Sequence, residues 1–137
     1  MSRRRTAAVP AEATQLAVLT QFLRDFWAEE RLPPEHALSF ELALEEIFVN
    51  VVTHGATDGR VPKAEVTLLL CDRDLSMTLE DDGPQFDPLA RPSPDVTAEL
   101  SDRPVGGLGI FLVRKLMDTV SYERIATRNR LMMSKRL

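Results

Sequence analysis

The placement of proline constrains the fold of this chain more than any other feature of its sequence. Five of the nine prolines lie between residues 83 and 106, namely Pro84, Pro88, Pro92, Pro94 and Pro104. Proline lacks a backbone N–H and clashes with the preceding turn of a helix, so a regular helix or a central strand is disfavoured there. A loop of this length inside a compact domain is usually either disordered or functional. We therefore expect ordered elements on both sides of one long loop.

Hydrophobic periodicity predicts helices and strands on both sides of that loop. Helical spacing covers residues 12–31 and about 108–118. A further helix is expected from Pro34 or Glu35 to about His54, because proline suits a first helical position. Runs with β character predict five strands, at residues 5–9, 64–71, 75–81, 119–126 and 129–137. Strands in hairpins with helices between them predict an α+β fold. We expect a two-layer α/β sandwich, with a mixed, mostly antiparallel sheet and helices on one face.

The bulk properties predict a single cytoplasmic domain spanning residues 1–137. A net charge of −4 and a pI of about 5.2 argue against broad nucleic-acid binding, which requires a basic face. The basic run Arg3-Arg4-Arg5 is interpreted as a solvated N-terminal tail. Cys71 is the sole cysteine, so no internal disulfide can form. No apolar stretch approaches the ~20 residues that cross a bilayer, so no membrane association is expected.

The second expected helix carries polar residues opposite its apolar face. Glu46 and Asn50 are four residues apart and so share one face, one turn from each other. Glu45 is adjacent to Glu46 but points about 100° away around the helix. His54 is expected to cap or pack at the helix end. A solvated polar face explains this pattern as well as a functional site does.

An acidic pair stands where the strand over residues 75–81 is expected to end. Asp81 and Asp82 are followed directly by Gly83 and Pro84. A simple turn accounts for these residue types, because Asp and Gly suit turn conformations. Alternatively, one ionised carboxylate at the strand end accepts a hydrogen bond from an exocyclic amine of a ligand.

Three glycines lead into the third expected helix: Gly106, Gly107 and Gly109. Glycine permits close approach of a ligand to the backbone, and the free N–H groups at a helix start bind phosphate. A flexible loop before a helix is the alternative interpretation. The pattern is neither the dinucleotide fingerprint nor a Walker A loop, since no Gly-Lys-Ser/Thr follows it.

Taken in order, these three motifs resemble the boxes of the GHKL superfamily of histidine-kinase-like ATPases. The motif Glu46-x-x-x-Asn50-x-x-x-His54-Gly55 resembles the N box of this superfamily. Asp81-x-Gly83 resembles its first glycine box, and Gly106-Gly107-x-Gly109-Ile110 resembles its second glycine box. Three further segments resemble the RsbW-type branch of serine-kinase anti-sigma factors. They are Gly83-Pro84-x-Phe86-Asp87-Pro88, residues 109–118 and Asn129-Arg130-Leu131-x-Met133-x-Lys135. The resemblance runs from about residue 5 to residue 137. Two departures are Gln85, where the superfamily often has glycine, and Leu108, where many relatives have arginine.

This resemblance implies a Bergerat-type ATP-binding fold and a role for each matching residue. The residues implied in ATP binding are Asn50, Asp81, Gly83, Gly106, Gly107, Gly109 and Ile110. Asn50 would also coordinate Mg²⁺, for which an amide oxygen is a suitable hard ligand. Glu46 would be the general base, with Glu45 as the other carboxylate to consider. Residues 87–105 would form an ATP lid, with Arg91 and Arg103 as its basic residues.

The resemblance also implies a regulatory function. A protein of this type holds a sigma factor inactive and uses Mg-ATP to phosphorylate a seryl hydroxyl of a STAS-domain antagonist, and homodimers are possible. Two alternatives remain open. One is a module that binds ATP and a partner without phosphotransfer. The other is a detached histidine-kinase catalytic domain, although the sequence shows no helix pair carrying a phospho-accepting histidine.

Overall fold

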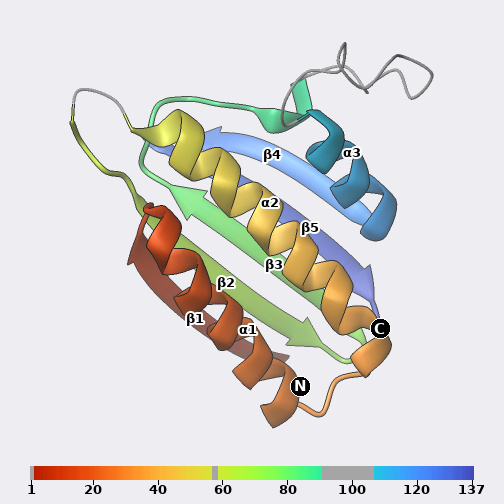
Figure 1. Ribbon diagram of the computed structural model, residues 1–137. Helices are drawn as coiled ribbons and strands as arrows, with labels where there is room; N and C mark the ends of the chain where they lie inside the picture. Colours follow the sequence, from red (N-terminus) through yellow and green to blue (C-terminus); the bar gives the residue numbers. More distant parts are fainter. Residues whose placement is uncertain (1, 57–58, 91–106) are drawn as a thin grey trace.

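The computed structural model describes residues 2–56, 59–90 and 107–137 (Figure 1). Its helices and strands are, in chain order, β1 (Ser2–Pro10), α1 (Leu16–Glu29), α2 (Ala37–Gly55), β2 (Lys63–Cys71), β3 (Asp74–Asp81), α3 (Gly107–Leu116), β4 (Thr119–Ile125) and β5 (Arg128–Arg136). Short 3-10 turns precede α1 and α2, and a further one, η3 (Pro88–Ala90), follows β3. The sequence predicts each helix and strand, with ends that differ by a few residues.

The five strands form one sheet in the order β1-β2-β3-β5-β4. Each neighbouring pair in this sheet is antiparallel, so the expectation of a mixed sheet is wrong in that detail. The reason is topological: β1 pairs with β2 although two helices separate them in sequence, and β3 pairs with β5 across α3 and β4. β3 and β4 run in the same direction, and the crossover between them passes through α3. Because β5 lies between these two strands, no two neighbouring strands of the sheet are parallel.

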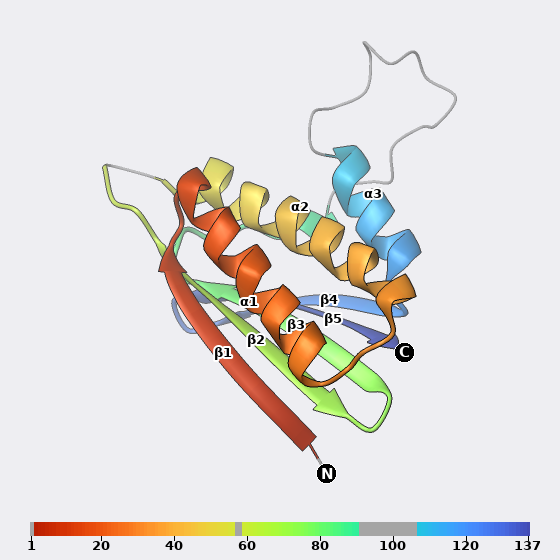
Figure 2. The ribbon, with the colours of Figure 1, turned by 60° about the horizontal axis from the view of Figure 1, so that its bottom comes forward.

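The helices cover one face of the sheet, which gives the expected two layers (Figure 2). α2 runs across the middle of that face, between α1 and α3 (Figure 1). The core between the layers includes Leu19, Leu23, Phe26, Phe40, Leu44, Phe48, Val66, Leu68, Leu75, Met77, Leu79, Leu131 and Met133. Along β3 and β5, buried apolar residues alternate with more exposed residues. The buried residues face the helices, and the more exposed residues face away from them. None of the helices in the described ranges is long and apolar enough to cross a membrane.

The N-terminal basic run is part of an edge strand and not a solvated tail. β1 pairs with β2 from Ser2 opposite Cys71 to Pro10 opposite Lys63. Arg3 and Arg5 point to the helix side of the sheet, where they form ion pairs with Glu30 and Glu29 at the end of α1. The earlier interpretation failed because like charges favour a tail in isolation, whereas acidic residues of α1 neutralise them here.

The end of α2 is packed closely against the segments that flank the sheet. A β-carbon built at Gly55, the last residue of α2, would lie 2.6 Å from Cγ of Pro62. No real β-carbon tolerates that distance, and the proline ring cannot swing aside as a flexible chain could. Glycine at position 55 thus lets the last turn of α2 approach the strand ends.

Candidate functional site

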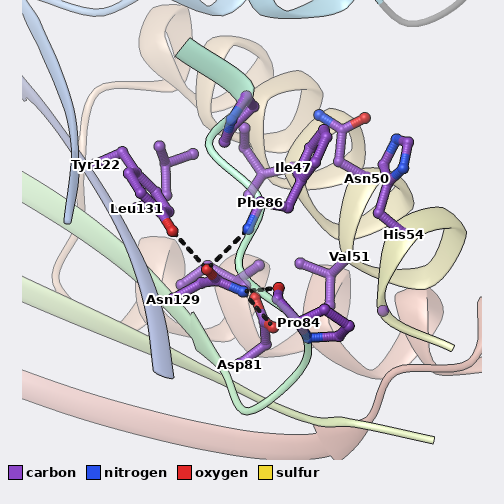
Figure 3. A pocket seen from close by; sticks show the side chains of 13 residues that line it. Ile47, Asn50, Val51, His54, Asp81, Pro84, Phe86, Tyr122, Asn129 and Leu131 are labelled. Atoms are coloured by element: carbon purple, nitrogen blue, oxygen red, sulfur yellow. Dashed lines mark hydrogen bonds between the residues drawn. The ribbon is translucent and has the colours of Figure 1, made fainter. Parts of the chain in front are cut away.

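A hollow lies where α2 crosses the ends of β3, β4 and β5 (Figure 3). It is lined by residues of α2, of the sheet and of the segment that follows β3: Ile47, Asn50, Val51, His54, Gly55, Leu79, Asp81, Pro84, Phe86, Pro88, Tyr122, Asn129 and Leu131. Most of these side chains are apolar, and a few polar groups converge between them. This composition is typical of a small-molecule site.

Two polar residues of the hollow are buried. Asp81 and Asn129 are each 6% exposed, and they are the two buried polar side chains among the residues that the structure describes. They face each other directly across the β3–β5 pair. Asn129 Nδ2 donates a hydrogen bond of 3.0 Å to Asp81 Oδ1. Burying polar groups costs free energy unless they are hydrogen-bonded, so this contact makes the pair tolerable in the interior.

The Asn129 amide is hydrogen-bonded on both sides (Figure 3). Its Nδ2 also donates to the carbonyl of Pro84, at 2.8 Å. Its Oδ1 accepts from the Tyr122 hydroxyl at 2.6 Å and from the backbone N–H of Phe86 at 3.2 Å. These four contacts match the two donors and two acceptor positions of an amide. Asn129 thereby joins three strands to the segment after β3.

The Asp81 carboxylate is held on one side. Its Oδ1 accepts from the backbone N–H of Gly83 at 2.9 Å as well as from Asn129. Within the described ranges, these hydrogen bonds both go to Oδ1, which leaves Oδ2 for a donor in the hollow. Burial raises the pKa of Asp81, while the hydrogen bonds from Asn129 and Gly83 and the charge of Arg124 oppose that rise. Arg124 itself donates to the carbonyl of Gly83, at 2.9 Å.

Gly83 lies in a narrow space between Asp81 and the end of α2. A β-carbon at this position would lie 3.0 Å from Asp81 Oδ1 and 3.3 Å from the Cα of Gly55. The two glycines thus allow the chain after β3 to pass beneath α2. The departure at Gln85 leaves this geometry intact, because the Gln85 side chain is exposed.

Phe86 and His54 form one wall of the hollow. Their rings stack with centroids 4.0 Å apart and an interplanar angle of 16°. His54 therefore packs at the end of α2, as the sequence predicts. The cavity beneath has a volume of about 30 Å³, room for one or two waters. A nucleotide base is larger than this cavity, so the lining would have to rearrange before a base could enter.

Glu46 lies one turn from Asn50 on α2, outside the lining of the hollow. Its half-buried side chain contacts the first turn of α3 at Gly109, where a β-carbon would overlap the Glu46 carboxyl. Burial, and secondly the charge of Glu45, raise the pKa of Glu46. Glu45 itself is exposed. Of the two adjacent carboxylates, Glu46 is the one held in a defined environment.

The remaining predicted residues lie at α3 or outside the described ranges. Gly107 begins α3, and Ile110 is 6% exposed within the core, so its side chain packs between helix and sheet. Gly106, Arg91 and Arg103 lie outside the described residues, as does most of the expected lid. The described start of that lid is tied to α3, because Arg114 donates to the carbonyl of Leu89 at 2.9 Å.

Comparison with known proteins assigns the family. A family model described as a histidine kinase-like ATPase domain matches residues 9–135. The chain belongs to the histidine kinase-like ATPase family. The serine/threonine-protein kinase BtrW of Bordetella bronchiseptica is 34% identical over 104 residues, which is 74% of this chain and 68% of that protein. These matches confirm the assignment to the superfamily of histidine-kinase-like ATPases and show a relationship to a serine/threonine-protein kinase.

Two solved structures share the fold. The RsbU and RsbW domains of Rv1364c from Mycobacterium tuberculosis align with a TM-score of 0.71 at 18% identity, covering 98% of this chain and 32% of that one. The histidine kinase domain of a blue-light activated histidine kinase from Erythrobacter litoralis EL346 aligns with a TM-score of 0.55 at 16% identity. This alignment covers 94% of the present chain and 62% of the chain of the histidine kinase domain. The chain thus spans about a third of the first structure. Its alignment with that structure confirms the predicted α+β fold.

Sequence reasoning missed several residues of the site. Tyr122, Arg124 and the paired role of Asn129 were not among the predicted site residues, although Asn129 opens the closing run that resembles the RsbW-type branch. One signal was present: Asn129 is the polar member of an alternating series with Leu131 and Met133, which face the core. A polar residue at a core-facing strand position requires a buried partner.

Proposed function

We propose that this histidine kinase-like ATPase is a Mg-ATP-dependent serine/threonine protein kinase that acts on a STAS-domain antagonist and also binds a sigma factor. The observation that carries the proposal is the buried Asp81 carboxylate, which lines the hollow and whose Oδ1 is engaged by Asn129 and Gly83. The relationship to a serine/threonine-protein kinase supports the choice of reaction. A cytoplasmic location and homodimer formation remain expectations of the same kind.

Asp81 would recognise the base of ATP. An ionised carboxylate oxygen accepts hydrogen bonds only, so Oδ2 pairs with an exocyclic amine. The apolar side chains of Ile47, Val51 and Leu131 would contact the base faces. Because the cavity is narrow, binding would move Phe86 away from its present position.

Asn50 would hold Mg²⁺ through its amide oxygen. Mg²⁺ usually keeps several waters and takes most other ligands from substrate phosphates, so one amide oxygen from α2 suits it. Asn50 lines the hollow on the side of α2 that also carries Glu46 one turn earlier. Mg-ATP would supply the phosphoryl group that is transferred.

Glu46 would act as general base toward the seryl hydroxyl of the partner. A carboxylate whose pKa is raised by burial is better matched to accept a proton near neutral pH. The seryl oxygen would form the new bond to phosphorus while its proton passes to Glu46 and ADP departs. Phosphoryl transfer depends mainly on positioning and charge neutralisation, which Asn50 with its Mg²⁺ would supply.

The decisive experiment is a phosphotransfer assay. The purified protein is incubated with radiolabelled ATP, Mg²⁺ and the STAS-domain protein encoded nearby in the genome. We expect label on a serine of the STAS protein. Asn50→Ala should weaken Mg-dependent nucleotide binding and turnover together, whereas Thr53→Ala, an exposed change one turn away, should alter neither.

Three outcomes would contradict the proposal in different ways. Nucleotide binding without transfer to any STAS protein would leave an ATP-dependent binding module, the first alternative. Label that reaches only histidine of a partner would instead favour a histidine-kinase catalytic domain. Absence of nucleotide binding in calorimetry would remove the kinase proposal altogether.

A further inference from the structure

Asn129 stands in the centre of a row of three polar side chains on the helix-facing side of the sheet. Asp81 lies opposite it on β3, and Arg124 lies opposite it on β4. Arg124 contacts the Gly83 carbonyl, so it closes the row without bonding to Asn129. The only direct neighbour of the Asp81 carboxylate within this row is therefore the Asn129 amide, at 3.0 Å.

The orientation of the Asn129 amide is determined by its other partners. Both the Tyr122 hydroxyl and the Phe86 N–H donate to Oδ1. If the amide turned by 180°, its NH₂ group would face the Phe86 N–H donor and its oxygen would face the Pro84 carbonyl and the Asp81 carboxylate. Each of these contacts would then be repulsive. Tyr122 and Phe86 thus keep the NH₂ group directed at Asp81.

We propose that Asn129, oriented by Tyr122, is a positioning residue that makes the hollow select adenine over guanine. The inference rests on the proposed binding of ATP and extends it to the choice of base. Together with the Gly83 N–H, Asn129 engages Oδ1 and so fixes the rotation of the Asp81 carboxylate, which leaves Oδ2 as the acceptor. Asn129 itself is turned toward Asp81 and the segment after β3, so it acts through them.

The chemistry of the two purines makes this orientation selective. Adenine carries an amine, a donor, at the ring position where guanine carries a carbonyl, an acceptor. A fixed carboxylate oxygen pairs with the amine but repels the carbonyl and leaves it unsatisfied in a buried place, which is a strong source of discrimination. A carboxylate that could rotate would lose part of both effects.

The first test compares ATP and GTP binding by calorimetry in the wild type and in Asn129→Ala. We expect ATP affinity to fall about 5- to 100-fold and GTP affinity to change far less, so that the ATP/GTP ratio falls. A merely structural role would weaken both nucleotides alike. Met132→Ala, an exposed change on the same strand, is the matched control and should leave the ratio as in the wild type.

A second variant removes donation while keeping shape. Asn129→Asp can still accept from Tyr122 and Phe86, but at neutral pH it places a second carboxylate beside Asp81. We expect ATP binding to be lost near neutral pH and partly recovered on acidification, when the introduced carboxyl gains a proton and can donate to Asp81. Asn129→Ala should show no such recovery. Groups that also influence this pH profile are His54, Asp82, Asp87, Tyr122 and Arg124.

The results separate this inference from the proposed function. If wild-type protein binds no nucleotide, the proposed function fails and the inference fails with it. If wild-type protein binds ATP but Asn129→Ala keeps the wild-type ATP/GTP ratio, the inference alone is overturned. If Asn129→Ala fails to fold, Tyr122→Phe takes its place, because it removes one donor to Asn129 Oδ1. The proposal is overturned if Tyr122→Phe keeps the wild-type ATP/GTP ratio and Asn129→Asp binds ATP fully at neutral pH.

Discussion

The carboxyl group of Glu46 occupies the space that a β-carbon at Gly109 would fill. Glu46 lies in the middle of α2, and Gly109 lies in the first turn of α3, far along the chain. Free N–H groups and the positive end of the helix dipole are found in such a first turn, which suits an acidic neighbour. Glycine at this position therefore serves the carboxylate of another helix. The position of the proposed base depends on it directly.

Gly109→Ala should separate catalysis from folding. In an ordinary helix, replacing glycine by alanine stabilises by about 0.5–1 kcal/mol. Here the new methyl group would push Glu46 out of place, so we expect phosphotransfer to fall by about 10²–10⁴-fold, the range for a displaced general base. The measurement is the single-turnover rate with saturating ATP.

Leu112→Ala is the control for that change, because Leu112 is an exposed residue of the same helix. It should transfer phosphate at the wild-type rate. If Gly109→Ala also keeps the wild-type rate, the contact with Glu46 has no catalytic role.

Glu46→Gln should abolish most phosphotransfer while nucleotide affinity stays the same. The substitution preserves shape but removes the base, which predicts a loss of about 10²–10⁴-fold in rate. Glu45→Gln is the paired comparison, since Glu45 is exposed and one position away. If Glu45→Gln is the inactive variant and Glu46→Gln transfers phosphate normally, the general base is Glu45 and not Glu46.

The core of the fold could be predicted because its pattern is local. Leu19, Leu23 and Phe26 recur at helical spacing, and Leu75, Met77 and Leu79 alternate as a strand does; all are buried. The same periodicity placed α2 and hence the shared face of Glu46 and Asn50. Local spacing was sufficient wherever one element determined the geometry.

The parts that could not be predicted depend on contacts between distant segments. Asp81 and Asn129 are 48 residues apart, and no spacing rule reveals that they are opposite each other in the sheet. The overlap of Gly109 with Glu46 likewise depends on how two helices pack. Arg3 gave a misleading signal, because its neutralising partner Glu30 belongs to another element.

Asp81→Asn should weaken ATP binding by about 1–3 kcal/mol, the cost of leaving a buried polar group mismatched. The amide keeps an oxygen for the donors Gly83 and Asn129, so the local fold is retained. Its NH₂ group would then face the amine of the base. Calorimetry should show the loss, and equal ATP affinity in Asp81→Asn and wild type would remove Asp81 from the site.

Gly55→Ala should destabilise the protein. The new methyl group would meet the ring of the buried Pro62, with Cγ at 2.6 Å. Overpacking of this kind costs about 1–3 kcal/mol in the free energy of unfolding, measurable by denaturant titration. Thr53→Ala, an exposed change in the same last turn, should stay within about 0.5 kcal/mol of wild type. Equal stability of the two variants would show that α2 can shift away from Pro62.

Glu46 should also make stability depend on pH. Burial, and then the charge of Glu45, raise the pKa of Glu46 in the folded protein, whereas the unfolded chain ionises at the ordinary carboxyl value. The folded state thus binds the proton more tightly, so this stabilisation is complete below the unfolded pKa and is lost as the pH rises through the folded pKa. Glu46→Gln cannot ionise, so its thermal unfolding midpoint should exceed that of wild type at about pH 8 and lose this advantage near about pH 4. Glu12→Gln, at an exposed position, should show no such pH-dependent gain. A Glu46→Gln midpoint that tracks wild type at every pH would mean that the carboxylate ionises in the fold without cost.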